Sequence, residues 1–360
     1  MSDTKPIRHG EELNAENLRA FLRENLGVKT GEISISQFPA GNSNLTYCIK
    51  IGGEEYVLRR PPFGNQVKSA HDMSREYNVL EKLSKVYAPA PKPLIYSDDE
   101  SITGAEFYLM ERRRGTIIRG KLSEPSAVAD GLSFVNSKDF QKKVIETFIE
   151  NLVELHSLDY KKAGLGDLGK PEGYTQRQTE GWTKRYFNAK TDEHAELEKA
   201  IRWLNENIPA DDAPSLVHND YKFDNIMLDP NDLTKIVAVL DWEMTTIGSP
   251  LMDFGTTLGY WMPKDAPPEM FALPANPAVL MKNFSHRDLA EIYAEKSGKD
   301  LRDLNFYYAF GVFKIAVICQ QIYFRFVKGF TRDERFKNFN YFVNALGKIA
   351  LNAIESSEIF

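Results

Sequence analysis

The chain of 360 residues has few cysteines, no extended basic run and no long uninterrupted apolar segment. Its two cysteines, Cys48 and Cys319, are too far apart for a Cys-x-x-Cys metal site and too few for a disulfide framework, which predicts a reducing, cytoplasmic setting. The formal net charge is −6 and no run of five or more Lys and Arg occurs, so we expect no nucleic-acid partner. The first ten residues lack the apolar core of a secretory signal.

The apolar content suits a globular protein but is not concentrated into a membrane span. Hydrophobic residues make up 42% of the chain and charged residues 27%, which excludes intrinsic disorder. The most apolar stretch, 306–326, is interrupted by Lys314 and Arg325. We interpret it as a buried helix of a core, so no membrane partner is expected.

The hydrophobic periodicity predicts an α+β protein with a strand-rich first lobe, residues 1–111, and a mostly helical second lobe, residues 112–360. In the first lobe we expect helices at 14–26 and 73–86, and strands at 32–38, 44–51, 55–60 and 106–110. Gly52-Gly53 is a hairpin signal between two of these strands. In the second lobe we expect helices at 139–158, 192–207, 286–297, 301–327 and 333–354, short strands at 216–218, 225–228 and 236–240, and loops at 115–134 and 262–277.

Residues 115–122 imitate a phosphate-binding P-loop but lack its essential parts. Gly115, Gly120 and Lys121 have the required spacing, yet Leu122 stands where a Ser or Thr hydroxyl must ligate magnesium. The Ser-Glu-Pro sequence that follows does not begin a helix whose N-terminus could face a phosphate. We therefore interpret this segment as a loop.

The strongest catalytic signal is the segment from His218 to Asn225, set between two short apolar runs. Asp220 and Asn225 have the spacing of a kinase catalytic loop, in which the Asp orients or deprotonates the attacking hydroxyl and the Asn oxygen holds Mg²⁺. Asp241 ends an apolar run sixteen residues later, where its carboxylate can ligate the metal that bridges the ATP phosphates. We predict that Asp220 is catalytic and that Asn225 and Asp241 are metal ligands.

Three further polar residues belong to the same prediction. Lys222, two residues after Asp220, is predicted to lie near the transferred phosphate, although a plain surface lysine fits the pattern nearly as well. His156 closes a predicted helix, and Asp253 follows the predicted metal site. We interpret His156 and Asp253 as structural residues that brace the catalytic segment.

The runs LVHNDYKFDNIML (216–228), IVAVLDWE (236–243) and PLMD (250–253) together resemble the core of the aminoglycoside phosphotransferase and choline kinase family. Within it, the likeness is closest to the kinase-like domains joined to acyl-CoA dehydrogenases in animals and to their stand-alone bacterial relatives. The resemblance covers most of the chain. It implies a protein-kinase-like bilobal fold, ATP and Mg²⁺ as cofactors, and phosphoryl transfer to a hydroxyl.

The resemblance implies that the nucleotide binds the first lobe. Gly41, Ser43 and Asn44 match the loop that covers the phosphates in this family, although an ordinary hairpin turn has the same composition. On the third strand, Val57 and Arg59 share a face because side chains alternate along a strand. We predict that Val57 packs on the adenine and that Arg59 points at the phosphates.

Arg59 departs from the family pattern, which usually has Lys at this place. Arg keeps the charge but is longer and planar, which leaves open a pseudokinase that binds nucleotide without turnover. Glu76, on the following helix, is the predicted partner of Arg59; a solvated helix carboxylate is the alternative. Met110 and Arg112 end a strand where the chain could bind the adenine edge, as any linker could.

The acceptor is expected to be a small molecule. Only eleven residues separate Asp241 from Asp253, too few for a phosphorylated activation segment, which disfavours a protein kinase. Residues 256–330 contain nine Lys and Arg against seven Asp and Glu, a net charge of +2 that disfavours a polycationic aminoglycoside. A hydroxy acid or hydroxyacyl-CoA, as the nearest relatives imply, ranks first; an aminoglycoside- or choline-type kinase is the alternative.

Lys314, Gln321 and Arg325 share one face of the predicted helix 301–327. A polar stripe on so apolar a helix must face either solvent or a cavity. We predict that these three residues bind an acidic acceptor, and a solvated outer face is the alternative. The sequence does not indicate an oligomeric state.

Overall fold

The computed structural model describes residues 3–27, 31–39, 44–63, 72–119, 137–272 and 275–356. The chain divides into two compact units. The N-terminal unit comprises Met1–Arg114 and Ala238–Glu243, and the helical unit comprises Gly115–Val237 and Met244–Phe360. The sequence prediction assigns all of 112–360 to the second lobe, whereas Arg112–Arg114 and Ala238–Glu243 belong to the N-terminal unit. The latter segment returns because the Val239 N–H donates to the Pro89 carbonyl and Trp242 packs edge-on against Tyr87.

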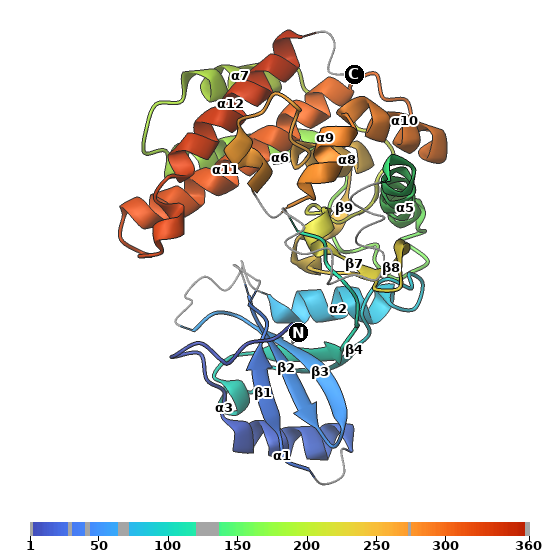
Figure 1. The fold of residues 1–360 in the computed structure, drawn as a ribbon, viewed down its shortest axis with the longest axis vertical. Coiled ribbons are helices and arrows are strands. Elements are labelled where there is room, and N and C mark those ends of the chain that lie inside the picture. Colours follow the sequence, from blue (N-terminus) through green and yellow to red (C-terminus); the bar gives the residue numbers. More distant parts are fainter. Residues whose placement is uncertain are drawn as a thin grey trace. The chain divides into compact units, whose positions relative to one another are not determined.

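The described strands of the N-terminal unit form a five-stranded antiparallel sheet in the order β1-β2-β3-β5-β4. The strands are β1 (Ser34–Gln37), β2 (Leu45–Ile51), β3 (Glu54–Arg60), β4 (Pro93–Ser97) and β5 (Phe107–Glu111). They are joined by helices α1 (Ala15–Leu26), α2 (Met73–Leu83) and α3 (Glu100–Thr103), drawn in blue to teal in Figure 1. Gly52 and Gly53 both have positive φ, 62° and 88°, and form the predicted hairpin turn between β2 and β3.

The two faces of this sheet have different chemistry. On one face, Leu18 and Leu22 of α1 pack into an apolar core with Tyr47, Ile49 and Leu58. The other face carries the alternate residues of the same strands, and it meets α2, whose Glu76 is buried there. The strand period therefore separates a structural face from a face with charged groups.

The helical unit consists of α-helices and two short strand pairs. The helices are α5 (Lys138–Ser157), α6 (Tyr174–Ala189), α7 (Ala195–Glu206), α8 (Pro250–Gly259), α9 (Ala278–Asn283), α10 (His286–Ser297), α11 (Leu304–Val327) and α12 (Phe339–Glu355). Strand β6 (Ser215–Val217) pairs with β9 (Thr246–Gly248), and β7 (Ile226–Asp229) pairs with β8 (Asp232–Val239). Short 3₁₀ turns lie at Phe223–Asn225, Trp242–Met244, Pro268–Ala272 and Glu334–Phe336.

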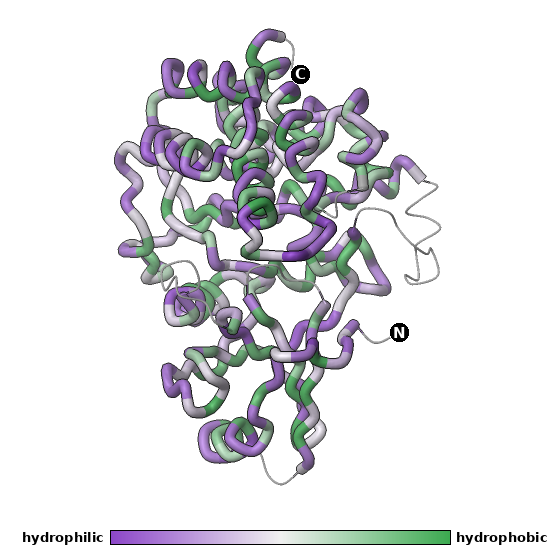
Figure 2. Tube along the Cα trace, turned by 90° about the vertical axis from the view of Figure 1, so that its left-hand side faces the viewer, coloured by the Kyte–Doolittle hydropathy of each residue, from purple (hydrophilic) through white to green (hydrophobic). Residues whose placement is uncertain are grey.

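Helix α11 is the central helix of this unit. By length and composition alone, its 24 residues are apolar enough to cross a membrane. In the structure it packs against α6, α7, α8 and α12, and most of its side chains from Leu304 to Gln320 are buried. Figure 2 shows hydrophobic segments gathered in the interior of this unit and hydrophilic turns around them. Packing against the other helices thus accounts for the apolar character of α11, as the sequence predicted.

Two glycines allow α8 and α11 to cross in backbone contact. A Cβ on Gly311 would collide with the carbonyl oxygen of Gly255, and one on Gly255 would collide with the carbonyl of Tyr307. No larger residue fits at this crossing without separating the helices. The contact fixes α11 against the helix that begins with the segment Pro250–Asp253.

Several elements differ from the sequence prediction. Helices α6 and α8 were not predicted: α6 carries few apolar residues, and all ten residues of α8 are buried, so neither shows an apolar face. Helix α9 and strands β4 and β9 were also not predicted. The expected loop 262–277 contains a 3₁₀ turn. Residues 120–134 of the expected loop 115–134, including 120–122 of the P-loop-like segment, lie outside the described residues.

Candidate active site

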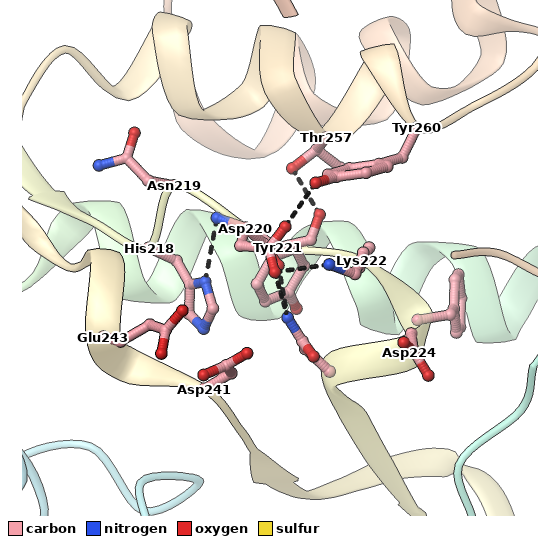
Figure 3. Close-up of polar contacts among 12 residues, drawn as sticks. His218, Asn219, Asp220, Tyr221, Lys222, Asp224, Asp241, Glu243, Thr257 and Tyr260 are labelled. Carbon is pink, nitrogen blue, oxygen red and sulfur yellow. Dashed lines mark hydrogen bonds and ion pairs between the residues drawn. The ribbon is translucent and has the colours of Figure 1, made fainter. Parts of the chain in front are cut away.

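Asp220 follows β6 in the helical unit and is surrounded by hydrogen-bond donors. Its Oδ1 accepts a hydrogen bond from the Tyr260 hydroxyl at 2.6 Å. Its Oδ2 accepts from the Lys222 ammonium at 2.5 Å and from Nδ2 of Asn225 at 2.9 Å. Figure 3 shows Lys222 and Tyr260 directed at this carboxylate from the loop and from the end of α8. The structure therefore brings together the predicted residues Asp220, Lys222 and Asn225.

These donors keep Asp220 ionised. Burial would raise its pKa, but the Lys222 charge and the hydrogen bonds from Lys222 and Tyr260 outweigh this effect and lower the pKa below its usual value. The ammonium of Lys222 also lies 4.7 Å from the centre of the Tyr260 ring. A partly buried, ionised carboxylate of this kind can accept a proton or orient a hydroxyl.

The backbone before Asp220 is held by a buried carboxylate. Asp253 accepts the N–H groups of His218 and Asn219, each at 2.7 Å, and the His156 ring lies 3.1 Å from its Oδ2. The other ring nitrogen of His156 is 2.9 Å from the Tyr293 hydroxyl. Burial raises the pKa of Asp253, but these hydrogen bonds reverse the effect and lower it. Asp253 and His156 thus brace the loop, as the sequence predicted.

Two residues at or beside predicted site positions have left-handed backbone conformations. Among the described residues other than glycine, only Asn219 and Asp241 have positive φ, 67° and 68°. Such conformations persist where the surroundings over-determine them, and they concentrate at active sites. One precedes the candidate catalytic residue, and the other is a candidate metal ligand.

A second charged cluster lies within the N-terminal unit, around Arg59 of β3. Its guanidinium is 3.3 Å from Oε1 of Glu76 and 2.9 Å from Oδ1 of Asp241. Glu243 lies 3.7 Å away. The pair of Arg59 and Glu76 predicted from the sequence is therefore present, and two further carboxylates of the described chain join it.

Burial and charge oppose each other in this cluster. Burial lowers the pKa of Arg59, but the nearby carboxylates, Glu76 foremost, raise it well above its usual value. For Glu76 burial dominates and raises the pKa, although the charge of Arg59 lowers it in part. The cluster thus holds a permanent cation among acidic groups that are costly to bury unpaired.

Of the other residues predicted to bind the nucleotide, some lie near the Arg59 cluster and others lie outside the described residues. Asn44 is buried, and its amide donates to Glu243 at 2.8 Å. Val57 is buried on the same face as Arg59, and its partner on the neighbouring strand β5, Met110, is buried too. Gly41 and Ser43 lie outside the described residues.

Arg112 has partners that the sequence did not predict. Its guanidinium donates to Asp3 at 2.6 Å, to Glu55 at 2.5 Å and to the Cys48 sulfur at 3.0 Å. With these residues it lines a polar cavity of about 280 Å³. Its side chain is thus tied to neighbouring strands and the N-terminal segment, so a contact to adenine stays a prediction.

The sequence model of the Phosphotransferase enzyme family matches residues 34–273, two thirds of the chain. The chain belongs to this phosphotransferase family. Acyl-CoA dehydrogenase family member 11 of Homo sapiens is 33% identical over 344 residues, which cover 92% of this chain and 42% of that protein. Its Gallus gallus counterpart is 32% identical over 330 residues, which cover 89% and 40%. The chain therefore spans about two fifths of the length of these relatives.

Solved structures show the same fold. An aminoglycoside phosphotransferase-like protein from Ralstonia eutropha is 30% identical, with a TM-score of 0.77 over 96% of this chain and 100% of that one. A choline kinase from Cryptosporidium parvum has a TM-score of 0.63 at 12% identity, covering 95% and 96%. The aminoglycoside phosphotransferase APH(4)-Ia in complex with ADP and hygromycin B has a TM-score of 0.61 at 16% identity, covering 95% and 100%. The predicted family and protein-kinase-like α+β fold are confirmed.

In this phosphotransferase, the three predicted acceptor residues of α11 have different surroundings. Lys314 is buried, and its ammonium donates to the main-chain oxygen of Asn219 at 2.6 Å. Gln321 is half-buried and Arg325 is exposed. They lie about 10 and 16 Å farther along the helix, at 1.5 Å per residue. The three therefore do not form one uniform stripe, and contact with an acceptor stays a prediction.

Sequence reasoning missed two residues that the structure places in these clusters. Tyr260 lies forty residues from Asp220, and its hydroxyl reaches the carboxylate only because α8 packs beside the loop. Glu243 follows Asp241 by two residues, so the Asp-Trp-Glu sequence could have signalled a second carboxylate. Among the described residues, no group of three or more His, Cys, Asp and Glu side chains is arranged to hold a metal ion.

Proposed function

We propose that the chain is an ATP- and Mg²⁺-dependent kinase that transfers the γ-phosphate of ATP to a hydroxyl of a small acidic acceptor, a hydroxy acid or a hydroxyacyl-CoA. The observation that carries the proposal is the partly buried, ionised Asp220 with Lys222, Asn225 and Tyr260 around it. In phosphoryl transfer the protein mainly positions the reactants and stabilises charge, and a carboxylate in a loop of this spacing orients the nucleophile.

Asp220 would take the proton of the acceptor hydroxyl. The acceptor oxygen forms a bond to the γ-phosphorus while the bond from that phosphorus to the bridging oxygen of ADP breaks, and ADP leaves with the electron pair. Lys222, already 2.5 Å from Asp220, would meet the negative oxygens of the transferred group. Arg59 would bind the phosphates of ATP with its planar guanidinium, as the resemblance to the family implies.

The donor set fits Mg²⁺, which prefers a few carboxylate and carbonyl oxygens together with phosphates and water. The amide nitrogen of Asn225 donates to the carboxylate and the main-chain oxygen of Asp220, so its amide oxygen is the group left to bind a cation. Asp241 would supply a carboxylate. When bound, Mg²⁺ neutralises charge on the phosphates and stabilises the leaving ADP.

The acidic acceptor is supported by charge and by relatives. Residues 256–330 carry a net charge of +2, which favours an anionic acceptor and disfavours a polycation. Relatives that match this chain are acyl-CoA dehydrogenase family members, and structures of the same fold include a choline kinase and a complex with ADP and hygromycin B. These support a small-molecule acceptor and an adenine nucleotide. The proposed cytoplasmic setting rests instead on the low cysteine content of the sequence.

The test is a phosphorus NMR screen of Mg²⁺-ATP with hydroxy acids, hydroxyacyl-CoAs, choline, homoserine and aminoglycosides. We expect a phosphorylated acidic product, no transfer in EDTA, and a loss of ~10²-fold or more in Asp220→Asn with nucleotide binding retained. The matched control is Asp229→Asn, which removes a carboxylate at the end of β7. We expect this variant to keep the wild-type turnover. Nucleotide binding without transfer to any acceptor would indicate a pseudokinase, and phosphorylation of choline or an aminoglycoside alone would contradict the acidic acceptor.

A further inference from the structure

Lys314 is a buried charge that the proposed mechanism does not use. The side chain is only 2% exposed, in the middle of α11. Its Nζ lies 5.6 Å from the centre of the Trp182 ring, and within the described residues no carboxylate lies within ion-pair distance of it. Lysine is rarely buried without such a partner, so this position needs a specific explanation.

Within the part of the chain that the structure describes, the hydrogen bond of this ammonium is made to the catalytic loop. Lys314 Nζ donates to the main-chain oxygen of Asn219 at 2.6 Å. Burial lowers the pKa of Lys314 to about 8, while Asp220 and Asp253 raise it in part. A cation kept here at a cost in solvation therefore acts on the residue directly before Asp220.

Asn219 is held at each of its polar groups by a different part of the helical unit. Its N–H donates to Asp253 at 2.7 Å, and its side-chain amide donates to the Met244 carbonyl at 3.1 Å. Its side-chain oxygen accepts from the Tyr174 hydroxyl at 3.2 Å, and its main-chain oxygen accepts from Lys314. The left-handed backbone, φ 67°, is thus fixed from several sides.

We propose that Lys314 is a positioning residue for phosphoryl transfer: its buried ammonium fixes the left-handed Asn219 and so directs the Asp220 carboxylate toward the acceptor. This inference rests on the proposed function of Asp220. The crossing of α8 and α11 at Gly255 and Gly311 gives the ammonium a rigid support, because those backbones are in contact. The Tyr260 hydroxyl, at the end of the same α8, completes the arrangement.

This role differs from acceptor binding by the same residue. A side chain that is 2% exposed and bonded to a main-chain oxygen offers little surface to a substrate. Loss of an acceptor contact would raise the acceptor KM, whereas loss of loop positioning lowers kcat and leaves the ATP KM unchanged. The two roles are therefore separable by steady-state kinetics.

The test compares Lys314→Met, Lys314→Gln and Gln320→Met in the 360-residue chain. Gln320 is a matched control, because it is a buried polar residue of the same helix whose amide donates to the Ala189 carbonyl, away from the loop. Turnover is measured with the acceptor found in the screen. Hydrogen exchange of the peptide 215–222 is measured independently of turnover.

We expect Lys314→Met to lower kcat about tenfold or more with the ATP KM within about twofold, and to speed exchange of the Asn219 and Asp220 amides about tenfold or more. Lys314→Gln keeps a hydrogen-bond donor, so its kcat should fall less and its amide exchange should speed up less. Gln320→Met should change neither kcat nor the exchange of these amides, although it should lower the denaturation midpoint because it removes a buried hydrogen bond.

Wild-type kcat and exchange in Lys314→Met would overturn the proposal, as would a raised acceptor KM with unchanged kcat. A lower kcat without faster exchange would also overturn it, because Lys314 would then act on the reacting groups directly. If Lys314→Met does not fold, Lys314→Gln decides by the same two measurements. If the wild-type chain transfers phosphate to no acceptor, the proposed function fails, and the exchange arm still decides whether Lys314 holds the loop.

Discussion

Arg59 in the N-terminal unit and Lys314 in the helical unit are both buried cations, but their surroundings differ. Arg59 is 8% exposed and has Glu76, Asp241 and Glu243 within ion-pair distance in the described chain. Lys314 is 2% exposed and bonds a main-chain carbonyl. The pKa of Arg59 is raised well above its usual value, because its acidic neighbours outweigh burial, whereas burial lowers that of Lys314 to about 8.

The difference indicates two uses of a buried charge. Around Arg59 the negative charges exceed the positive one, so the cluster suits the arrival of a cation and of phosphates that compete for the guanidinium. Lys314 is under-compensated and tied to the backbone, so its charge suits a fixed geometry. One cluster is expected to rearrange when ligands bind, and the other to stay in place.

The largest effect is expected from removing Arg59, the buried cation that has acidic partners. Arg59→Met leaves Glu76 and its neighbours without their cation, which should cost about 3–5 kcal/mol in the free energy of unfolding at neutral pH. The loss should shrink as the pH falls, because burial raises the pKa of Glu76 and its carboxyl group is then neutralised by protonation in the folded state. Arg59→Lys should recover part of the loss. Denaturant unfolding measures the effect, with the exposed Lys85→Met as control; equal losses in both variants would contradict the importance of the cluster.

The second prediction concerns pH and Lys314. Its pKa of about 8 in the folded chain lies below the ordinary 10.5, so between these values the unfolded chain binds the proton more readily. The free energy of unfolding of wild type relative to Lys314→Met should therefore rise by up to ~3 kcal/mol from pH 8 to 10.5. Asp220 and Asp253 oppose the shift, and Lys222 and Arg185 reinforce it. A difference independent of pH would show that the ammonium is not destabilised by burial.

The third prediction separates Lys314 from the loop without changing its charge. Gly311→Ala places a methyl group against the Gly255 carbonyl, so α8 and α11 must move apart at an expected cost of about 1–3 kcal/mol in stability. Turnover should fall as well, because Lys314 lies one turn along the same helix. Thermal unfolding and kcat measure both effects. Gly181→Ala in α6, where a Cβ meets only the end of Arg185, is the control and should not destabilise the chain.

The smallest effect is expected where a neutral donor is lost. Tyr260→Phe removes the hydroxyl from Oδ1 of Asp220 but keeps the ring beside Lys222. A neutral hydrogen bond contributes about 1 kcal/mol, so kcat should fall roughly fivefold, less than in Lys314→Met. Steady-state turnover measures this loss. A larger loss than in Lys314→Met would show that the donor, not the buried charge, determines the position of Asp220.

The sequence by itself determined what local spacing can encode. The catalytic segment 218–225, the turn at Gly52-Gly53 and the shared face of Val57 and Arg59 follow from short-range patterns. So does the central helix α11, whose long apolar run required burial. These features have one physical cause: the geometry of a turn, strand or helix repeats within a few residues.

The tertiary structure alone decided which distant groups meet. Tyr260 reaches Asp220 across forty residues, and Lys314 reaches Asn219 across ninety-five, through a helix crossing that depends on two glycines. The sequence showed Lys314, Gln321 and Arg325 on one helix face but could not tell which of them would be covered. Burial depends on neighbouring elements, and α6 and α8, which pack here, had no apolar period to reveal them. Periodicity fixes the direction of a side chain, whereas packing decides its solvent exposure and therefore the cost of its charge.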